Sequence, residues 1–474
     1  MYNGIDDLPQ RNIHLTHIIF QYTLKWIYIV IIKGGCFMIK FLITTFLASS
    51  LLFSMTVGFA APSSPELKGL VSGYFDNYLK DLEYITNIDS GSGNAEGSAQ
   101  IADFLKTRLE ESGAAVEYRT NDKGTHVIAR IKGEGTLKLL MMAHTDTVFE
   151  KGEAAKRPFH VDENLIAKGP GVGDDKATVV QTLYTVKALQ DINFKNYGEI
   201  IVYFAAEEET GSVTEDAIIT ELSQQADMCV VMDTARPNWG IVSQRKGQAT
   251  YQIKVEGISG HAGNAPQRSA SAIMELGNQI SMLYKLASPL PQDPTSMTDA
   301  ALAAKGIKYY GQFIPENTIN IGVIGTTNTK TNVVPDNAFA KLEVRGYKLS
   351  ELERIDKEIK ALNHKTVVPG TKVTITGGIA MGPMEKTLAV QKIIDIYKNI
   401  AKTEYNANVV EFVAGGLTDG NLSAKYIPTI DALGIENYDE HTANETVDLK
   451  TVTPRTVVLV EFIQQLANEL PAKK

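Results

Sequence analysis

Past residue 62 the chain alternates short runs of apolar and β-branched residues with segments of helical periodicity. This alternation predicts an α/β fold built on a mostly parallel sheet, because helices that cross between parallel strands cover both faces of the sheet. The apolar runs that we expect to form its strands cover residues 126–131, 137–142, 199–206 and 228–232. The first helices are expected over residues 98–112 and 175–189.

From about residue 248 the pattern changes to alternating strands and amphipathic helices, which predicts an inserted α+β domain. The strands and helices expected there cover residues 249–255, 269–286, 317–324, 339–344 and 350–362. The first pattern resumes near residue 380, and 474 residues are more than one hydrophobic core usually serves. We therefore expect an N-terminal extension over 1–60, a main domain in two parts over 61–247 and 380–474, and an inserted domain over 248–379.

The composition is that of a folded globular protein, with 44% hydrophobic and 21% charged residues. The net charge of −9 argues against a nucleic-acid partner, which a basic surface would attract. The two cysteines, Cys36 and Cys229, lie on either side of the cleavage site discussed next. The mature chain would therefore hold one thiol and no internal disulfide.

Residues 38–60 have the layout of a secretory signal peptide. Lys40 gives it a charged start, an apolar stretch follows, and small residues mark a cleavage site near Ala60. An uncleaved membrane anchor is the alternative, but Ser, Thr and Gly within the stretch favour cleavage. We expect an exported protein, periplasmic or secreted, with no stable membrane association after cleavage. The apolar run over 18–32 fits no targeting scheme, and Met38 is a candidate translation start.

Polar residues follow the predicted strands, at the edge where open α/β sheets build their sites. His144 and Asp146 follow one strand and suit a metal ligand oriented by an acid, although such a pair alone is more often a surface hydrogen bond. A glycine-rich turn then delivers Asp174 and Asp175 to a helix start. Glycines before a helix also suit a phosphate, but two adjacent acids would repel a phosphate and attract a cation.

Three further groups lie later in the chain. Consecutive glutamates at 207–209 follow the next strand, where one carboxylate can bind a metal while its neighbour acts as a base. Asp233 follows the strand after that, with helix capping as the alternative, and His441 lies in the last part of the main domain. Two histidines and three carboxylates from loops at one sheet edge match the nitrogen and oxygen preference of a pair of Zn²⁺ ions.

Together these residues resemble the dinuclear zinc peptidase and deacylase family of glutamate carboxypeptidase, acetylornithine deacetylase, succinyl-diaminopimelate desuccinylase, aminoacylase and carnosinase. The resemblance runs from about residue 90 to the C-terminus and is greatest to bacterial glutamate carboxypeptidase. Several ordered motifs argue against a chance match, whereas any single one would be weak. The motifs are Ser90-Gly-Ser-Gly-Asn94, Gly169-Pro-Gly171, Glu208-Glu209 with Gly211-Ser212, and Gly260-His-Ala-Gly263.

The resemblance implies a zinc-exopeptidase-like catalytic domain and an inserted α+β lid and dimerisation domain. It implies two Zn²⁺ ions per subunit, which other divalent metals such as Co²⁺ could replace. His144 and Asp233 would bind one ion, Glu209 and His441 would bind the other, and Asp174 would bridge them; these ligands are His144, Asp174, Glu209, Asp233 and His441.

The same resemblance implies roles for two neighbouring acids. Glu208 would be the general base that takes a proton from the attacking water and passes it to the leaving amine. Asp146 would orient His144. The family also has a cis peptide bond after the bridging aspartate, which here is the bond between Asp174 and Asp175.

Four further residues match substrate-facing positions. His261 resembles the family histidine that reaches into the partner subunit's site and stabilises the oxyanion, which implies a homodimer. Asn332 and Arg345 match positions that bind the substrate's free carboxylate, a task that suits a planar guanidinium, with a surface ion pair as the alternative for Arg345. Gly416, beside Gly415, fits a loop that lets the substrate backbone approach closely.

These features predict an exported zinc-dependent metallopeptidase, an exopeptidase of carboxypeptidase type that cleaves an amide bond in small peptides or N-acyl amino acids. Asp233 departs from the pattern, because the carboxypeptidases and deacylases usually have Glu there, whereas the dipeptidases and aminopeptidases usually have Asp. An aminopeptidase or dipeptidase is therefore the alternative within the family. A metal-binding protein without turnover is the alternative from another class, and the presence of Glu208 argues against it. Asp174 and Asp175 disfavour a nucleotide-binding protein.

The signal peptide makes a direct prediction about the mature protein. N-terminal sequencing of natively expressed protein should find a chain that begins near Ala61 and lies outside the cytoplasm, because a signal peptidase cuts after the small residues. A mature chain that retains residues 41–60 would show a membrane anchor instead.

Overall fold

The computed structural model describes residues 64–212, 214–288, 299–304 and 314–470. The expected signal peptide and its cleavage site lie outside these residues. Among the described residues, no helix combines the length and the apolar character that crossing a membrane requires.

A six-stranded sheet forms the centre of the main domain. In spatial order its strands are β1 (Ala115–Thr120), β2 (Thr125–Lys132), β6 (Glu199–Ala205), β3 (Lys138–His144), β7 (Met228–Val231) and β16 (Thr429–Ile430). The strands from β6 to β16 pair in parallel, whereas β1 pairs with β2, and β2 with β6, in antiparallel fashion. The prediction of an α/β fold with a mostly parallel sheet is therefore confirmed.

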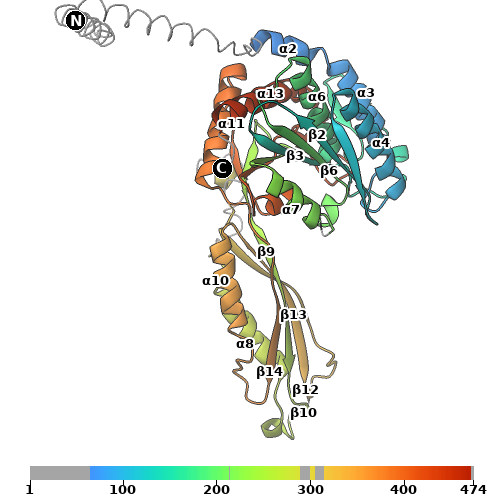
Figure 1. The fold of residues 1–474 in the computed structure, drawn as a ribbon. Coiled ribbons are helices and arrows are strands. Elements are labelled where there is room, and N and C mark those ends of the chain that lie inside the picture. The colour runs from blue at the N-terminus through green and yellow to red at the C-terminus, as the bar shows by residue number, and fades with distance from the viewer. Residues whose placement is uncertain (1–63, 213, 289–298, 305–313, 471–474) are drawn as a thin grey trace, which may run out of the picture. The chain divides into compact units, whose positions relative to one another are not determined.

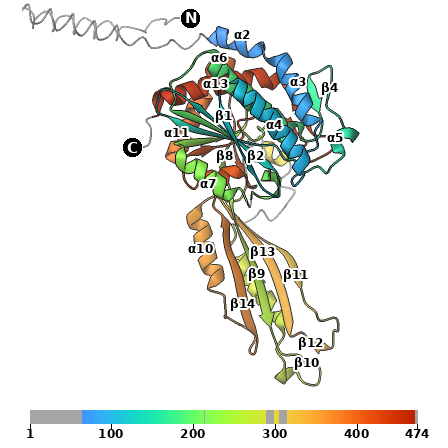
Figure 2. The same cartoon turned by 45° about the vertical axis from the view of Figure 1, so that its right-hand side comes forward.

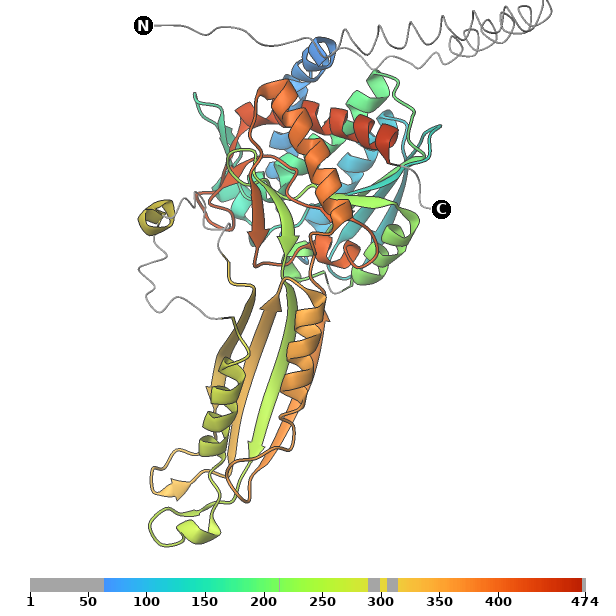
Figure 3. The same cartoon turned by 90° about the vertical axis from the view of Figure 1, so that its left-hand side faces the viewer.

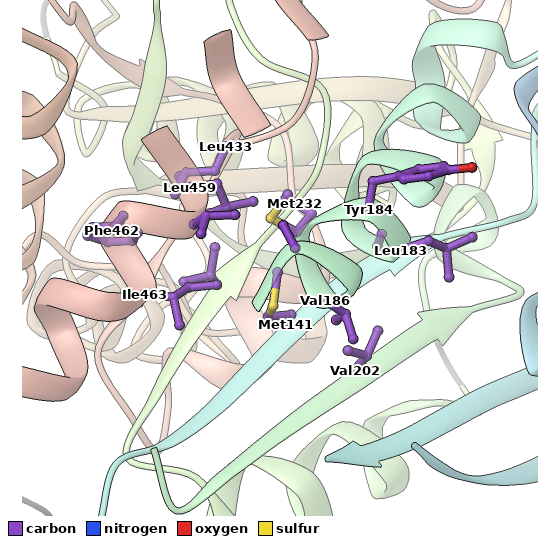
Figure 4. Close-up of a cluster of buried hydrophobic side chains, with 14 of the residues drawn as sticks. Met141, Leu183, Tyr184, Val186, Val202, Met232, Leu433, Leu459, Phe462 and Ile463 are labelled. Carbon is purple, nitrogen blue, oxygen red and sulfur yellow. The ribbon is translucent and has the colours of Figure 1, made fainter. Parts of the chain in front are cut away.

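Helices cover both faces of this sheet, as Figures 1 and 2 show. Along β3, Leu139 and Met141 enter the cluster under α6 and α13, whereas Leu140 and Met142 enter the cluster under α7. Figure 4 shows Met141 between side chains of α6 and α13. The helices of this domain are α2 (Ser64–Ser72), α3 (Phe75–Thr86), α4 (Ala95–Glu111), α5 (Glu153–Lys156), α6 (Ala177–Asp191), α7 (Asp216–Gln225), α11 (Leu388–Tyr405), α12 (Asp419–Ser423) and α13 (Val452–Glu469).

Two of the helix starts that differ from the periodicity have an identifiable local cause. The helix expected from residue 175 begins at Ala177, because Asp174 and Asp175 have non-helical backbone angles within an irregular turn. The helix expected from residue 98 begins at Ala95, because Asn94 caps it by accepting a hydrogen bond from the Gly97 N–H.

Two smaller sheets join distant segments of the main domain. β8 (Ile241–Arg245) pairs in parallel with β15 (Glu411–Ala414). The other sheet has the order β17 (Asn437–Tyr438), β18 (Thr446–Asp448), β5 (Ile166–Lys168) and β4 (His160–Val161). Because β18 pairs with β5, the segment that carries His441 lies next to the glycine-rich loop that carries Asp174.

The inserted segment contains an antiparallel sheet of β11 (Asn317–Gly325), β13 (Asn337–Gly346), β9 (Gly247–Glu256) and β14 (Lys372–Met381). Alternate residues of β9, such as Tyr251 and Ile253, are buried against α8 (Ala272–Tyr284) and α10 (Leu349–Lys360), which Figure 3 shows alongside the strands. The segment also contains α9 (Asp299–Ala304) and a ribbon of β10 (Gly260–His261) with β12 (Val333–Val334). The expected domain boundaries stay predictions.

Candidate metal centre

Strand ends of the central sheet deliver several of the predicted site residues to one place. β3 ends at His144, whose partner in the parallel strand β6 is Ala205. The turn Glu208–Thr210 follows β6, and Asp233 follows β7, which pairs in parallel with β3 on its other side. Because parallel strands end at the same edge of a sheet, these side chains converge there.

Two groups of ligand atoms meet at Asp174. One contains Asp174, His144 and Asp233, the other contains Asp174, Glu209 and His441, and within each group the ligand atoms lie within 4.8 Å of one another. Oδ1 of Asp174 is 3.0 Å from Nε2 of His144, and Oδ2 is 3.0 Å from Nε2 of His441. The structure thus brings together the five residues assigned as ligands and places Asp174 in both groups. The bond between Asp174 and Asp175 is cis, as the resemblance implied.

The acidic groups of this cluster lack full compensation within the chain. Burial is the main cause that raises the pKa of Asp233, to about 7, and the pKa of Glu209, and the nearby charge of Asp174 acts in the same direction on both. Oε1 of Glu209 is buried and has no hydrogen-bond partner among the described residues. Buried carboxylates need compensating charge, and imidazole with carboxylate is the ligand set that Zn²⁺ and similar cations prefer. These residues therefore fit a pair of divalent cations.

Asp146 connects the two loops of the centre. Nδ1 of His144 lies 3.1 Å from the backbone carbonyl of Asp146 and 3.5 Å from its carboxylate, so a proton on Nδ1 leaves Nε2 for a cation. The carboxylate of Asp146 accepts hydrogen bonds from the backbone N–H groups of Glu208 and Glu209, at 3.1 and 3.2 Å, and from the Ser92 hydroxyl, at 2.6 Å. Asp146 thus fixes His144 and the glutamate turn together.

Glu208 lies beside the ligand groups. It lines a cavity of about 10 Å³ with His144, Asp233 and Asp419, a volume close to that of one water molecule. Burial raises the pKa of Glu208 well above its usual range, and the charges of Asp419 and Asp233 raise it further. A carboxyl group with a raised pKa next to a metal centre is suited to accept and return a proton.

Four other predicted site residues form their hydrogen bonds and ion pairs outside this cluster. His261 is exposed, and its Nδ1 accepts hydrogen bonds from backbone N–H groups. β10 places His261 beside the loop that carries Asn332, and the Asn332 carbonyl accepts a hydrogen bond from the Ala262 N–H at 2.9 Å. Arg345 lies within β13 and forms an ion pair with Glu343 at 2.9 Å. A side chain at Gly416 would meet no atom within 4 Å. Within the described ranges, no hydrogen bond or ion pair joins these four residues to the ligand groups.

Three residues that the sequence analysis did not assign contact the centre. Nη2 of Arg245, at the end of β8, lies 2.9 Å from Oδ2 of Asp233, and its Nε contacts Asp431. Asp419 is buried and accepts a hydrogen bond from the Ser212 hydroxyl. Glu445 accepts hydrogen bonds from the glycine-rich loop. Arg245 is the last residue of β8, and Asp419 is the first residue of α12. A charged residue at the end of an element is the sequence signal that could have identified these two.

The model of Peptidase family M20/M25/M40 matches residues 140–465 of this chain. The chain belongs to this family. It is therefore a hydrolase that acts on peptide or amide bonds, as the sequence predicted. Dinuclear metal binding is a property found in this family, and the two ligand groups fit it. The individual roles assigned to the site residues stay predictions.

Relatives across the M20/M25/M40 family match most of the chain. Carboxypeptidase G2 of Pseudomonas sp. (strain RS-16) is 29% identical over 398 residues, which are 82% of this chain and 89% of that protein. Succinyl-diaminopimelate desuccinylase of Ehrlichia canis (strain Jake) is 24% identical over 77% of this chain and 93% of its own length. The crystal structure of aminopeptidase PepT from Bacillus cereus shares the fold, with a TM-score of 0.67, 20% identity, and coverage of 83% of this chain and 99% of that one.

The neighbours Glu208 and Glu209 should respond differently to the same substitution. Glu208→Gln keeps size and hydrogen bonding but cannot accept a proton, so this variant should bind two metal ions, keep its substrate affinity and lose turnover by about 10²- to 10⁴-fold. Glu209→Gln replaces a charged ligand oxygen, so its first effect should be metal loss, with some activity returning at high added metal.

Metal analysis by mass spectrometry and steady-state kinetics on both variants measures these effects, and each variant is the control for the other. If the Glu208 variant loses metal while the Glu209 variant keeps two ions, the two roles are exchanged.

Proposed function

We propose that the protein is an exported, zinc-dependent exopeptidase of carboxypeptidase type. Its substrate would be a small peptide or N-acyl amino acid that ends in a free carboxylate. The observation that carries this proposal is a group of hydrogen-bond donors at Lys246, Arg345 and Tyr347, in which Nη1 of Arg345 and the Tyr347 hydroxyl are buried without an acceptor among the described residues.

Lys246 directly precedes β9, and Arg345 and Tyr347 lie at the end of β13. Nη1 of Arg345 and the hydroxyl of Tyr347 are buried and have no hydrogen-bond partner in the part of the chain that the structure describes. Lys246 is 1% exposed, and its Nζ lies 5.2 Å from the centre of the Tyr347 ring. The hydroxyl of Thr318, the register partner of Arg345, is 3.5 Å from this Nζ, at the limit of a hydrogen bond.

The charges of this group favour an anion. Burial and, to a lesser extent, the positive charge of Arg345 together lower the pKa of Lys246 to about 8. The ion pair of Arg345 with Glu343 uses Nε and Nη2, at 2.9 and 3.1 Å, and leaves Nη1 for another acceptor. A substrate carboxylate would satisfy these donors with charge-assisted hydrogen bonds, which are the strong class.

The donor group is directly connected to the metal centre along the chain. Lys246 follows Arg245, and Arg245 lies 2.9 Å from the proposed ligand Asp233. The Lys246 carbonyl also accepts a hydrogen bond from Asn421 at 3.1 Å, next to the turn that carries Asp419. A carboxylate bound at Lys246 would therefore belong to a residue whose amide bond lies near the centre, as an exopeptidase requires.

The chemistry would be divided between the cations and the chain. Two bound divalent cations would lower the pKa of the attacking water and stabilise negative charge on the carbonyl oxygen. Glu208 would take the proton of that water and deliver it to the leaving amine. Asp146 would keep His144 oriented, and Arg345 with Lys246 would hold the substrate carboxylate. Zinc is supported by the nitrogen and oxygen ligand set, and export by the pattern of residues 38–60.

A hydrolysis screen tests this function. Purified protein is assayed with N-acyl amino acids and dipeptides, each with a free and with an amidated C-terminal carboxyl group, with and without a chelator. We expect cleavage of the free acids only, abolished by the chelator. Arg345→Gln should raise KM for these acids by about 10- to 100-fold, since hydrogen bonds to charged groups contribute roughly 1.5–3 kcal/mol each.

The matched control is Arg354→Gln, which removes an arginine that pairs with Glu351 and Glu358 on the surface of α10. This variant should keep the KM of the unaltered protein. Equal cleavage of amidated and free substrates, or an unchanged KM in the Arg345 variant, would contradict the carboxylate site.

Asp233 favours a second candidate, an aminopeptidase or dipeptidase of the same family, because it replaces the Glu usual in the carboxypeptidases. Such an enzyme needs a free α-amino group on its substrate. Cleavage of N-blocked substrates in the same screen would exclude it, and cleavage of free dipeptides alone would favour it.

We further propose that the inserted segment forms a homodimer. β11 is an edge strand of its sheet, and its Ile324 is 62% exposed. On the neighbouring helix α8, Met274 is 68% exposed. An unpaired edge strand beside exposed apolar side chains is a surface that a second copy can cover symmetrically. Such a dimer would allow His261 to act in the partner's site.

His261→Ala should lower turnover by about 10²- to 10³-fold without changing metal content or dimer mass, because it removes one oxyanion donor. A mixing experiment shows in which subunit His261 acts. Dimers that combine a His261→Ala subunit with a Glu208→Gln subunit contain one complete site if His261 acts across the interface.

Random mixing should then restore about a quarter of the turnover of the unaltered protein, whereas each variant alone stays inactive. No recovery on mixing would place His261 in the site of its own subunit. Near-normal turnover of the His261 variant alone would show that it has no part in the reaction.

A further inference from the structure

The glycine-rich loop before α6 holds an anion that belongs to the chain itself, the carboxylate of Glu445. Oε1 of Glu445 accepts hydrogen bonds from the backbone N–H groups of Gly173 and Asp174, at 2.7 and 2.9 Å, and Oε2 accepts from Gly171 at 3.2 Å. Glu445 is 1% exposed. The loop thus has the anion-binding form that its glycines suggest, and a side chain occupies it.

The sequence of the loop is adapted to this contact. Gly171 has a φ of 68°, in the left-handed region that glycine tolerates. A Cβ at Gly173 would lie 2.5 Å from the side chain of Asn437, so no larger residue fits. Lys176 is buried behind the loop, where it donates to the carbonyls of Ile88 and Pro170. Burial lowers the pKa of Lys176 to about 7, and the nearby negative charge of Glu445 partly opposes this shift.

Glu445 also lies at the junction of the two segments that supply one ligand group. Thr446 is the register partner of Lys168, so the loop toward Asp174 and the loop that carries His441 leave the same pair of strands, β5 and β18. In addition to the pairing of β5 with β18, the hydrogen bonds of Glu445 connect the backbone of Asp174 to the loop that carries His441. His441 and Asp174 then meet at 3.0 Å.

We propose that Glu445 is a positioning residue that holds Asp174 and His441 at the separation at which both bind one metal ion. This inference rests on the proposed metal centre. Glu445 would not touch metal or substrate, and it would act through the backbone of Asp174. Its loss should therefore weaken the metal position of Glu209 and His441 more than that of His144 and Asp233.

The test is Glu445→Gln in the full chain. An amide offers a single oxygen, so at least one of the three backbone N–H groups would face an NH₂ group and lose its acceptor. The metal-free protein is titrated with Co²⁺ against a metal-binding dye, which gives stepwise dissociation constants without substrate. The step that Glu209→Gln also weakens identifies the position of Glu209 and His441.

The matched control is Glu275→Gln in the inserted segment. Glu275 is likewise buried and accepts hydrogen bonds from two backbone N–H groups, of Val367 and Val368, at 2.8 and 2.6 Å, far along the chain from the ligand groups. Thermal unfolding of the metal-free variants compares their stability. Both substitutions should destabilise the fold, and only the one at Glu445 should change metal affinity.

We expect Glu445→Gln to weaken the identified step by about 10- to 100-fold, a range typical for residues that support a ligand, and the other step much less. Glu445→Asp keeps both oxygens on a shorter side chain and should give an intermediate loss, which provides the measurement if the Gln variant does not fold. Unaltered affinity in both variants, or equal weakening of the two steps, would overturn the role of Glu445. Binding of a single ion by the unaltered protein would instead count against the proposed metal centre.

Discussion

Repulsion among carboxylates at one edge of the central sheet is the constraint on which the site depends. Asp174 shares one ligand group with Asp233 and the other with Glu209, and Glu208 lies beside them. Two like charges about 4 Å apart repel by roughly 4 kcal/mol at an effective dielectric of about 20, more than a single hydrogen bond of about 1.5–3 kcal/mol to a charged group returns. A single hydrogen bond therefore does not offset this repulsion, whereas divalent cations bound together with two histidines would.

Each acidic residue of the cluster is nevertheless held, through its backbone or its carboxylate, by a polar side chain on another segment. Asp146 holds the glutamate turn by its backbone N–H groups, Arg245 holds Asp233, and Glu445 holds the backbone of Asp174. These partners come from different strands and loops, so the geometry of the centre depends on the whole main domain. The packing of α6 and α13 on the sheet, seen in Figure 4, fixes the strand ends from which the ligands project.

The sequence was sufficient for the fold class, the family and the convergence of the five assigned ligands. His144, Glu209 and Asp233 follow predicted strands, and Asp174 follows a glycine-rich motif. The family resemblance implied His441. The sequence was not sufficient for Arg245, Asp419 and Glu445. Their partners lie far away in sequence: Arg245 contacts Asp431, and Glu445 contacts Gly171. No periodicity or spacing specifies such pairs. Helix starts were displaced for a local reason, since the irregular turn at Asp174 and the Asn94 cap override periodicity.

Asp233 shows why one ligand does not determine the substrate class. Its Oδ1 accepts a hydrogen bond from the Thr234 N–H at 2.6 Å and its Oδ2 contacts Arg245 at 2.9 Å, so both oxygens already interact with the chain. Arg245 is held from its other side by Asp431. Asp233 therefore takes part in the ion pairs around Arg245 as well as in its proposed metal position. The substrate's end group instead faces Lys246, Arg345 and Tyr347 in the proposed complex, and those residues are where carboxypeptidase and aminopeptidase activity should differ.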